Sequence, residues 1–375
     1  DDDGDDDDDD VDDDDDDDDV DGDGDGTRGG CAPTFGKLWW LCNAGFIGRV
    51  WANSICTCAS TKGKIMTTQI LFKGGPNSWQ EYEIPLSNAL KKTGLEYHLA
   101  EDISPEQVDY IVYAPSSRLR DFKPYTRCKV VLCLWAGVET IIGNKSLKMP
   151  LTRMVDNGMT QGMVEWVTGH VLRHHLGTDA HVLGQDGLWR SAIPPLAKDR
   201  TVTVLGLGAL GAACATTLAG LGFSVRGWSR RPKTIENITT FHGEDEFNQA
   251  LQDTEITVLL LPSTPETANT LDADAFSKMA PGAVVINSGR GPLIDDEALL
   301  QALDSGQLGH ATLDVFREEP LPVTHQFWAH PKITVTPHVA SATRIGTACT
   351  VIVENIQRGE AGLPFLHLAD AAAGY

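Results

Sequence analysis

Short apolar runs alternate with longer helical stretches along the chain from residue 66 onward. A first set of strand candidates lies at 70–72, 97–99, 110–113 and 130–134. A second set follows at 201–205, 224–228, 257–261, 283–287, 311–315 and 333–336. Short strands separated by helical segments are typical of parallel α/β sheets. The pattern therefore predicts an α/β protein with two doubly wound parallel-sheet domains.

Two helical stretches predict how the chain passes between these sheets. One covers 163–175, and the other covers 344–358 and stops at Gly359, a residue that commonly ends helices. If the second stretch returns to the first sheet, the first domain is discontinuous. We therefore predict one domain of residues 66–162 plus 343–375, and a central domain of residues 163–342.

Composition changes this picture only at the N-terminus. The net charge is -23, but residues 1–25 hold 20 of the 53 acidic residues and 27–65 hold none. From residue 66 on, 33 acidic side chains stand against 25 basic ones, a net charge of -8. This mildly acidic body gives no reason to expect nucleic acid or a membrane as a partner.

Residues 1–65 predict a disordered, acidic and low-complexity extension, because an Asp run repels itself and buries nothing. The run imitates an EF-hand loop from Asp21, but the twelfth position is Ala32 instead of the Glu that calcium needs. The basic, acid-free stretch 27–65 is typical of transit peptides, although an Asp run ahead of it is not. Our hypothesis is that the functional protein starts near Met66.

The eight cysteines carry no metal or disulfide signature. Cys56 and Cys58 are close in sequence, but nothing near them supplies further ligands at zinc spacing. The four cysteines after residue 66 are scattered: Cys128, Cys133, Cys214 and Cys349. We interpret these as reduced, buried thiols, which predicts a cytoplasmic protein without a bound metal.

A glycine-rich turn, Gly206-Leu207-Gly208-Ala209-Leu210-Gly211, joins the strand at 201–205 to an apolar helical stretch at 212–221. Gly206 permits the tight turn, Gly208 lets the backbone approach a pyrophosphate, and Gly211 lets helix and strand pack closely. The phosphates would lie at the helix N-terminus. This context predicts a Rossmann dinucleotide-binding domain, and a tight turn without a ligand is the alternative.

The second strand of this unit leads into Ser229, Arg230 and Arg231, where the adenosine ribose is expected. An acid at this place would accept from both ribose hydroxyls and repel a 2′-phosphate. A serine can donate to that phosphate, and two arginines can pair with it. The triplet therefore predicts NADP(H), with NAD(H) as the weaker alternative; solvated loop arginines are the competing interpretation.

Three further polar residues, Arg290, Glu319 and His338, follow three successive strands of the second set. Strand ends of a doubly wound sheet gather at one edge, where ligands bind. There the Arg can anchor a carboxylate and polarise a carbonyl, the His can give or take a proton, and the Glu can orient the imidazole. Each could be an ordinary loop residue alone, but their order predicts one catalytic site.

These motifs resemble the D-isomer-specific 2-hydroxyacid dehydrogenases. The resemblance covers most of 66–375 and includes the strings 261–267, 281–283, 302–306 and 318–322. Within the family it is strongest to a subgroup of reductases that act on glyoxylate and hydroxypyruvate. That subgroup shares the strings 135–139, 156–159, 228–230 and 374–375.

The resemblance implies roles for individual residues. It makes Arg290, Glu319 and His338 catalytic, with Glu319 chosen over Glu318 as the last acid before Pro320. Asp314 would accept from the nicotinamide carboxamide. The substrate carboxylate would be held by Arg290 and the backbone N–H groups of Ala136, Gly137 and Val138. The whole predicted cofactor site comprises Gly206, Gly208, Ala209, Leu210, Gly211, Ser229, Arg230, Arg231, Pro262 and Asp314.

The resemblance also implies a homodimer with a Rossmann cofactor domain and a discontinuous, flavodoxin-like substrate domain. The implied activity is reduction of a small 2-oxo acid by NADPH. Trp135 stands where the family commonly has a small residue, which narrows the expected pocket. Two alternatives stay open at this point: an NAD-linked dehydrogenase with another substrate, and a dinucleotide-sensing protein that keeps the fold.

Overall fold

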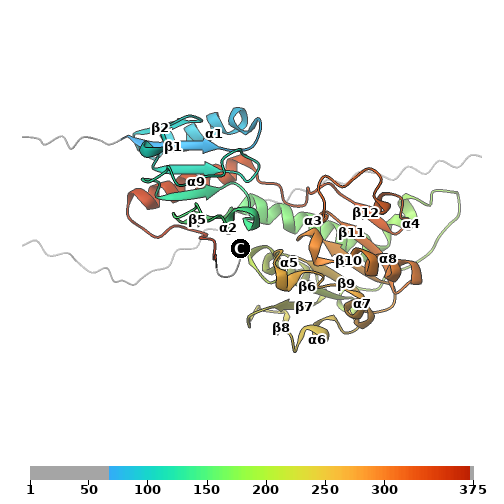
Figure 1. The fold of residues 1–375 in the computed structure, drawn as a ribbon. Coiled ribbons are helices and arrows are strands. Elements are labelled where there is room, and N and C mark those ends of the chain that lie inside the picture. Colours follow the sequence, from blue (N-terminus) through green and yellow to red (C-terminus); the bar gives the residue numbers. More distant parts are fainter. Residues whose placement is uncertain (1–66, 372–375) are drawn as a thin grey trace, which may run out of the picture. The chain divides into compact units, whose positions relative to one another are not determined.

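The computed structural model describes residues 67–371, which contain two parallel β-sheets flanked by helices (Figure 1). The first sheet has the strand order β2-β1-β3-β4-β5, and the second has the order β12-β11-β10-β9-β6-β7-β8. This confirms the predicted α/β fold with two doubly wound sheets. The predictions for residues 1–65, and the string 374–375, lie outside the described residues.

The first sheet contains β1 (Thr68–Lys73), β2 (Tyr97–Ala100), β3 (Tyr110–Tyr113), β4 (Val130–Cys133) and β5 (Leu151–Thr152). All its pairings are parallel, and the order 2-1-3-4-5 is the flavodoxin-like one that the resemblance implied. Every residue of β3 and β4 is buried. A strand covered on both faces reads as a continuous apolar run, which is why these two were visible in the sequence.

The helical elements beside this sheet are α1 (Ser78–Lys91), α2 (Glu139–Ile142), η1 (Pro105–Gln107) and α9 (Ile345–Glu360). Helix α9 is the last in the chain, yet its Ile352 and Ile356 are buried with Leu86 and Leu90 of α1 (Figure 1). The chain therefore returns to the first sheet, as a discontinuous domain requires. The boundaries at 162/163 and 342/343 stay predictions.

The second sheet is also parallel throughout. Its strands are β6 (Thr201–Leu205), β7 (Ser224–Ser229), β8 (Thr239–His242), β9 (Ile256–Leu259), β10 (Ala283–Asn287), β11 (Leu308–Leu313) and β12 (Ile333–Val335). The chain runs outward from β6 to β8, then restarts beside β6 with β9 and runs the other way. The strand order thus reverses between β6 and β9, and ligands of doubly wound sheets bind at such a switch point.

The remaining helical elements are α3 (Asn157–Leu176), α4 (Thr178–Val182), α5 (Ala209–Gly220), α6 (Phe247–Leu251), α7 (Ala273–Lys278), α8 (Asp296–Ser305), η2 (Ala197–Asp199), η3 (Pro265–Thr267), η4 (Gly291–Leu293) and η5 (Gln326–Trp328). Helix α3 begins six residues before its predicted start at residue 163, because the Asp156 side chain caps it by accepting from the Met159 N–H at 2.9 Å. Strands β5 and β8 were not predicted; the first is two residues long and the second has no fully buried position.

Within residues 67–371 no helix is both long and apolar enough to cross a membrane, and no cluster of three or more His, Cys, Asp or Glu is placed to hold a metal ion. The four cysteines in this range are free and buried, as the sequence predicted. Burial raises the pKa of the Cys128 and Cys214 thiols to about 12. A thiol that stays protonated at neutral pH is a poor nucleophile and metal ligand.

Candidate active site

The three glycines of the turn between β6 and α5 are needed for different structural reasons. Gly206 has φ +104°, and a Cβ there would lie 2.6 Å from the Leu260 carbonyl oxygen. A Cβ on Gly211 would lie 1.8 Å from the Gly206 oxygen. A Cβ on Gly208, in contrast, would meet no atom within 4 Å. The protein's own packing therefore requires the first and third glycines, whereas the second leaves open space beside the α5 N-terminus. That is the arrangement in which a dinucleotide pyrophosphate fits.

The loop after β7 presents positive charge at its surface. Arg230 and Arg231 are both exposed. Ser229 is buried, and its hydroxyl donates to the Arg231 carbonyl at 2.8 Å. The arginines can therefore reach a ligand from solvent, while the serine hydroxyl must rotate before it can donate to a phosphate. The role predicted for this triplet stays a prediction.

Lys233 belongs to the same region and was missed by the sequence reasoning, which stopped at the arginines. Its ammonium donates to the carbonyl of Leu207, inside the glycine turn. The glycine turn is also hydrogen-bonded to β7, because the Gly206 N–H donates to the Trp228 carbonyl at 2.8 Å. Lys233 therefore connects the arginine loop with the turn, and the basic residue two positions after Arg231 was the available signal.

The imidazole of His338 is held by Glu319. The Nδ1 atom lies 2.7 Å from Glu319 Oε2, and the two side chains are 51% and 35% exposed. The other carboxylate oxygen, Oε1, accepts from the Phe316 N–H at 2.9 Å. Glu319 thus orients the imidazole through Oε2, while the Phe316 N–H holds the Glu319 carboxylate in place through Oε1. The Nε2 atom is left as the ring position that can act on a substrate.

The loop that carries His338 is organised by Asp314. His338 has φ +52°, a left-handed conformation that is uncommon for a non-glycine residue. Its N–H donates to the Asp314 carbonyl at 2.8 Å, and the buried Asp314 carboxylate accepts from the Thr336 hydroxyl and from the N–H groups of Val339 and Ala340, at 2.6, 2.9 and 2.9 Å. Asp314 therefore stabilises the turn that aims the imidazole. Its predicted contact with a nicotinamide carboxamide stays a prediction.

Arg290 lies at the end of β10, against the loop after β4. Its Nε donates to Glu139 Oε1 at 3.2 Å, and its Nη1 donates to the Gly289 carbonyl at 2.7 Å. A Cβ built on Gly137 would lie 2.0 Å from Arg290 Nη2. The structure thus brings Arg290 together with the predicted substrate loop 136–138. Glu139 was part of a recognised string, but the sequence reasoning gave it no role.

A close contact between two loops joins the Arg290 side of the site to the His338 side. A Cβ on Gly291 would lie 1.9 Å from the carbonyl carbon of Phe316, so only glycine allows these backbones to touch. The next hydrogen bond runs from Phe316 to Glu319, and Glu319 holds His338. The backbone approach of Gly291 to Phe316 therefore links the loop of Arg290 to the loop that holds the Glu319–His338 pair. The need for glycine at 291 was also missed.

Two other histidines are paired with threonines away from these contacts. His174 Nε2 lies 2.9 Å from the Thr312 hydroxyl, and His310 Nε2 lies 2.9 Å from the Thr334 hydroxyl. Burial lowers the pKa of His174 to about 3 and that of His310 to about 4. Half-buried rings that stay neutral at physiological pH and pair with neighbouring hydroxyls have a structural role.

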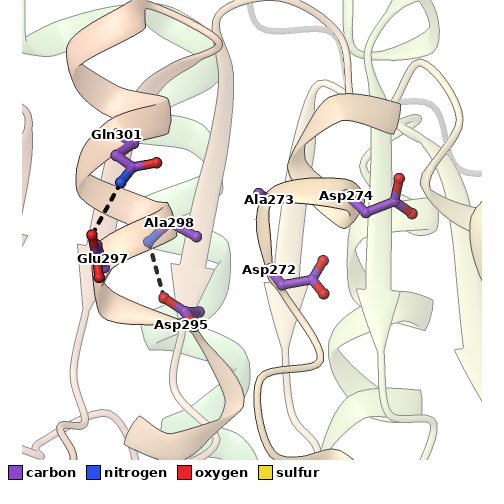
Figure 2. A pocket seen from close by; sticks show the side chains of 7 residues that line it. All are labelled: Asp272, Ala273, Asp274, Asp295, Glu297, Ala298 and Gln301. Carbon is purple, nitrogen blue, oxygen red and sulfur yellow. Dashed lines mark hydrogen bonds between the residues drawn. The ribbon is translucent and has the colours of Figure 1, made fainter.

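A hollow of about 280 Å³ lies at the N-termini of α7 and α8 and is lined by four carboxylates (Figure 2). Asp272 accepts from the Ala275 N–H and Asp295 accepts from the Ala298 N–H, each at 3.0 Å, so both acids are helix caps. Figure 2 shows the second cap and the neighbouring Gln301–Glu297 contact as dashed lines. Capping explains two of the four acids, and Asp274 pairs with Lys278 at 3.0 Å. A carboxylate-bearing substrate would be repelled here.

Comparison with known proteins extends over both sheets. Residues 169–340 match the family model of the NAD-binding domain of D-isomer specific 2-hydroxyacid dehydrogenases. Over 255 residues, the chain is 41% identical to glyoxylate/hydroxypyruvate reductase A of Yersinia enterocolitica, an alignment covering 66% of this chain and 82% of that protein.

Two solved structures are similar over their whole length. A D-isomer specific 2-hydroxyacid dehydrogenase from Xanthobacter autotrophicus, in complex with NADPH and MES, has a TM-score of 0.77 and 38% identity, and covers 83% of this chain and 100% of its own. The NADPH-dependent glyoxylate/hydroxypyruvate reductase from Sinorhizobium meliloti, in complex with NADP and sulfate, has a TM-score of 0.74 and 34% identity. The match covers 82% of this chain and 100% of that one. The similarity therefore extends over most of the chain.

Proposed function

Because the chain belongs to the D-isomer-specific 2-hydroxyacid dehydrogenase family, we propose that it reduces small 2-oxo acids, such as glyoxylate and hydroxypyruvate, with NADPH. The observation that carries this proposal is that Arg290 lies against the 136–138 loop, while its neighbour Gly291 touches the Phe316 backbone in the loop that holds the His338–Glu319 pair. An anion-binding guanidinium and a carboxylate-held imidazole are the two groups that reduction of a substrate with a carboxylate and a neighbouring carbonyl needs. The names of the relatives support the substrate class.

Each residue of the site has a part in the proposed reaction. Arg290 and the backbone of 136–138 grip the substrate carboxylate, and the guanidinium draws charge toward the neighbouring carbonyl oxygen. His338 Nε2 gives a proton to that oxygen, and Glu319 keeps the ring oriented while it does so. A bound NADPH would supply the hydride to the carbonyl carbon. The protein's own contribution is therefore positioning, charge and a single proton.

The residues present fit NADP(H) better than NAD(H). Three basic residues, Arg230, Arg231 and Lys233, follow the end of β7, where an NAD site carries an acid, and Lys233 reaches the glycine turn. The open space at Gly208 leaves room for the pyrophosphate. The solved relatives with NADPH or NADP bound support this choice.

The proposal is tested by mixing the purified protein with NADPH and glyoxylate or hydroxypyruvate and following the nicotinamide absorbance. We expect oxidation of NADPH with both acids and a much slower reaction with NADH. Faster turnover with NADH and another 2-oxo acid would favour the NAD-linked alternative. Dinucleotide binding without turnover of any 2-oxo acid would favour a nucleotide sensor.

A homodimer is part of the proposal, with the exposed segment after α4 as its contact surface. Several large apolar side chains are exposed there, and Trp189 is 96% exposed: Leu183, Leu188, Trp189, Ile193 and Leu196. Large apolar side chains gathered on one exposed segment mark an interaction site, and the family resemblance makes a second copy the expected occupant. The light-scattering mass should be that of a dimer and should fall to that of a monomer in Trp189→Ser combined with Ile193→Ser.

Two further assignments remain proposals. Residues 66–162 with 343–375 form the substrate domain and 163–342 the dinucleotide domain, which the burial of α9 with the first sheet supports. The four free, buried cysteines support a reducing, cytoplasmic compartment. Limited proteolysis that releases 163–342 intact would support the division, and fractionation of cells with an antibody would test the compartment.

A further inference from the structure

Glu139 has no part in the function proposed above, yet it contacts the residue on which substrate binding depends. Its Oε1 accepts from Arg290 Nε at 3.2 Å, across 151 positions in the sequence. We propose that Glu139 is a positioning residue that sets the orientation of the Arg290 guanidinium for the 2-oxo acid. This proposal deepens the reductase function and rests on it.

The hydrogen bonds of Arg290 show how the orientation is set. A guanidinium is a planar fork, so its grip on a carboxylate depends on which edge it presents. Glu139 takes the Nε donor, and the Gly289 carbonyl takes an Nη1 donor. Contacts at two corners of the plane fix its rotation. The rest of the fork is left to face the substrate.

The loop beneath this pair is shaped to admit it. A Cβ on Gly137 would lie 2.0 Å from Arg290 Nη2 and 2.6 Å from Glu139 Oε2. Both charged groups therefore lie over the same backbone atom, and Gly137 is the residue whose N–H was predicted to hold the substrate carboxylate. Because Gly137 has no side chain, the Arg290 guanidinium can lie close to the Gly137 backbone and its N–H.

The Arg290–Glu139 ion pair differs from an ordinary surface ion pair because both side chains are partly buried. The Arg290 and Glu139 side chains are 31% and 24% exposed, and Glu139 begins α2 directly after Val138, which is fully buried. A partly desolvated pair on a fixed backbone holds its geometry better than two solvated side chains do. The competing interpretation is that Glu139 occupies Arg290 and must be displaced by the substrate, and it predicts the opposite effect on KM.

The experiment compares Glu139→Gln, Glu139→Asp and the matched control Glu360→Gln. Glu360 pairs with Lys129 at 2.8 Å and is 28% exposed, so its loss removes a similar ion pair away from the site. We expect Glu139→Gln to lower kcat/KM for glyoxylate by about tenfold, the effect of weakening one charge-assisted hydrogen bond. Its Tm and KM for NADPH should match the wild type, Glu139→Asp should recover part of the loss, and Glu360→Gln should behave as wild type.

A double-mutant cycle with Arg290→Lys sharpens the test, because a lysine has no planar fork to orient. Adding Glu139→Gln to Arg290→Lys should therefore cost less than it costs alone. Unchanged kinetics in Glu139→Gln, a lower KM for the oxo acid, or a loss explained by a lower Tm would each overturn the proposal.

Calorimetric binding of oxamate, an unreactive carboxylate analogue of glyoxylate, to the NADPH complex keeps this test separate from the proposed activity. Weaker oxamate binding in Glu139→Gln supports the positioning role even if the wild type turns over no oxo acid, an outcome that would reject the reductase function alone. Equal oxamate binding in wild type and variant would overturn the positioning role, whatever the turnover.

Discussion

The cofactor turn lies on the second sheet, whereas the proposed oxo-acid site joins loops of both sheets, so the two are assembled in different ways. The turn is a single stretch, residues 206–211, whose glycines are explained by contacts close in the chain or on the neighbouring strand. The oxo-acid site joins the loop at 136–139 to loops near 290, 316 and 338. A local site can be identified from spacing, whereas a composite site depends on how loops meet.

The two regions also differ in what their glycines do. Gly206 and Gly211 serve the fold, and Gly208 leaves room for a ligand. In the oxo-acid site, Gly137 and Gly291 let distant segments approach each other. Substitutions can therefore separate residues that hold the protein together from residues that hold a ligand.

The largest effect is expected at the composite site, in His338→Ala. Loss of the general acid should lower kcat by about 10²–10⁴-fold, because the proposed proton donor to the carbonyl oxygen is removed. Steady-state kinetics with glyoxylate measure this, and NADPH binding should persist. His98→Gln, on the edge strand β2, is a matched control. Turnover near the wild-type value in His338→Ala would refute the proton-donor role.

The next effect is expected at the cofactor end, in Arg230→Gln combined with Arg231→Gln. Two charge-assisted contacts to a 2′-phosphate should be lost, which raises KM for NADPH by about 10- to 100-fold. KM for NADH should change little, because that cofactor has no such phosphate. Arg127→Gln removes an exposed arginine of the first sheet and is the control. Equal changes with both cofactors would contradict the assignment.

The glycine turn offers a direct comparison between Gly211→Ala and Gly208→Ala. The first places a methyl group against the Gly206 oxygen and should lower the free energy of unfolding by about 1–3 kcal/mol. The second adds a methyl group in open space, so the Tm without cofactor should stay unchanged while NADPH binds more weakly. Calorimetry and fluorescence titration measure the two quantities. A stable Gly208→Ala variant with full NADPH affinity would argue against a pyrophosphate at this turn.

The last effect is a pH dependence of stability that comes from two half-buried histidines. Burial lowers the pKa of His174 to about 3 and of His310 to about 4, whereas in the unfolded chain a histidine pKa is about 6.5. Below pH 6.5 the unfolded chain therefore binds more protons than the folded one. Their stabilising contribution is complete above pH 6.5 and is lost as the pH falls toward 4, by at most about 1.4 kcal/mol per pH unit for each ring.

The variant His310→Gln tests this pH dependence. Its free energy of unfolding should fall less steeply than that of the wild type between pH 7 and pH 5, because one of the two titrating rings is gone. Denaturant titrations at several pH values provide the slopes. Parallel slopes would show that His310 does not titrate differently in the folded and unfolded chains.

Much of the fold was predictable because its signals are local. Buried parallel strands such as β3, β4 and β9 read as continuous apolar runs. The edge strands β5 and β8 were missed because the first is only two residues long and the second has no fully buried position, whereas the edge strands β2 and β12 were predicted. The start of α3 depended on a capping carboxylate instead of on its apolar positions, so the pattern placed it too late.

The sequence by itself determined the two α/β units, the glycine turn and the order in which Arg290, Glu319 and His338 follow their strands. These features depend on spacing within a strand, a turn or a helix, and spacing is what a sequence records. Only the tertiary structure decided that Glu139 holds Arg290, that Gly291 admits Phe316, and that Asp314 organises the loop of His338. Such contacts depend on how loops pack across the sheet edge, and the same residue types could have faced solvent in another packing.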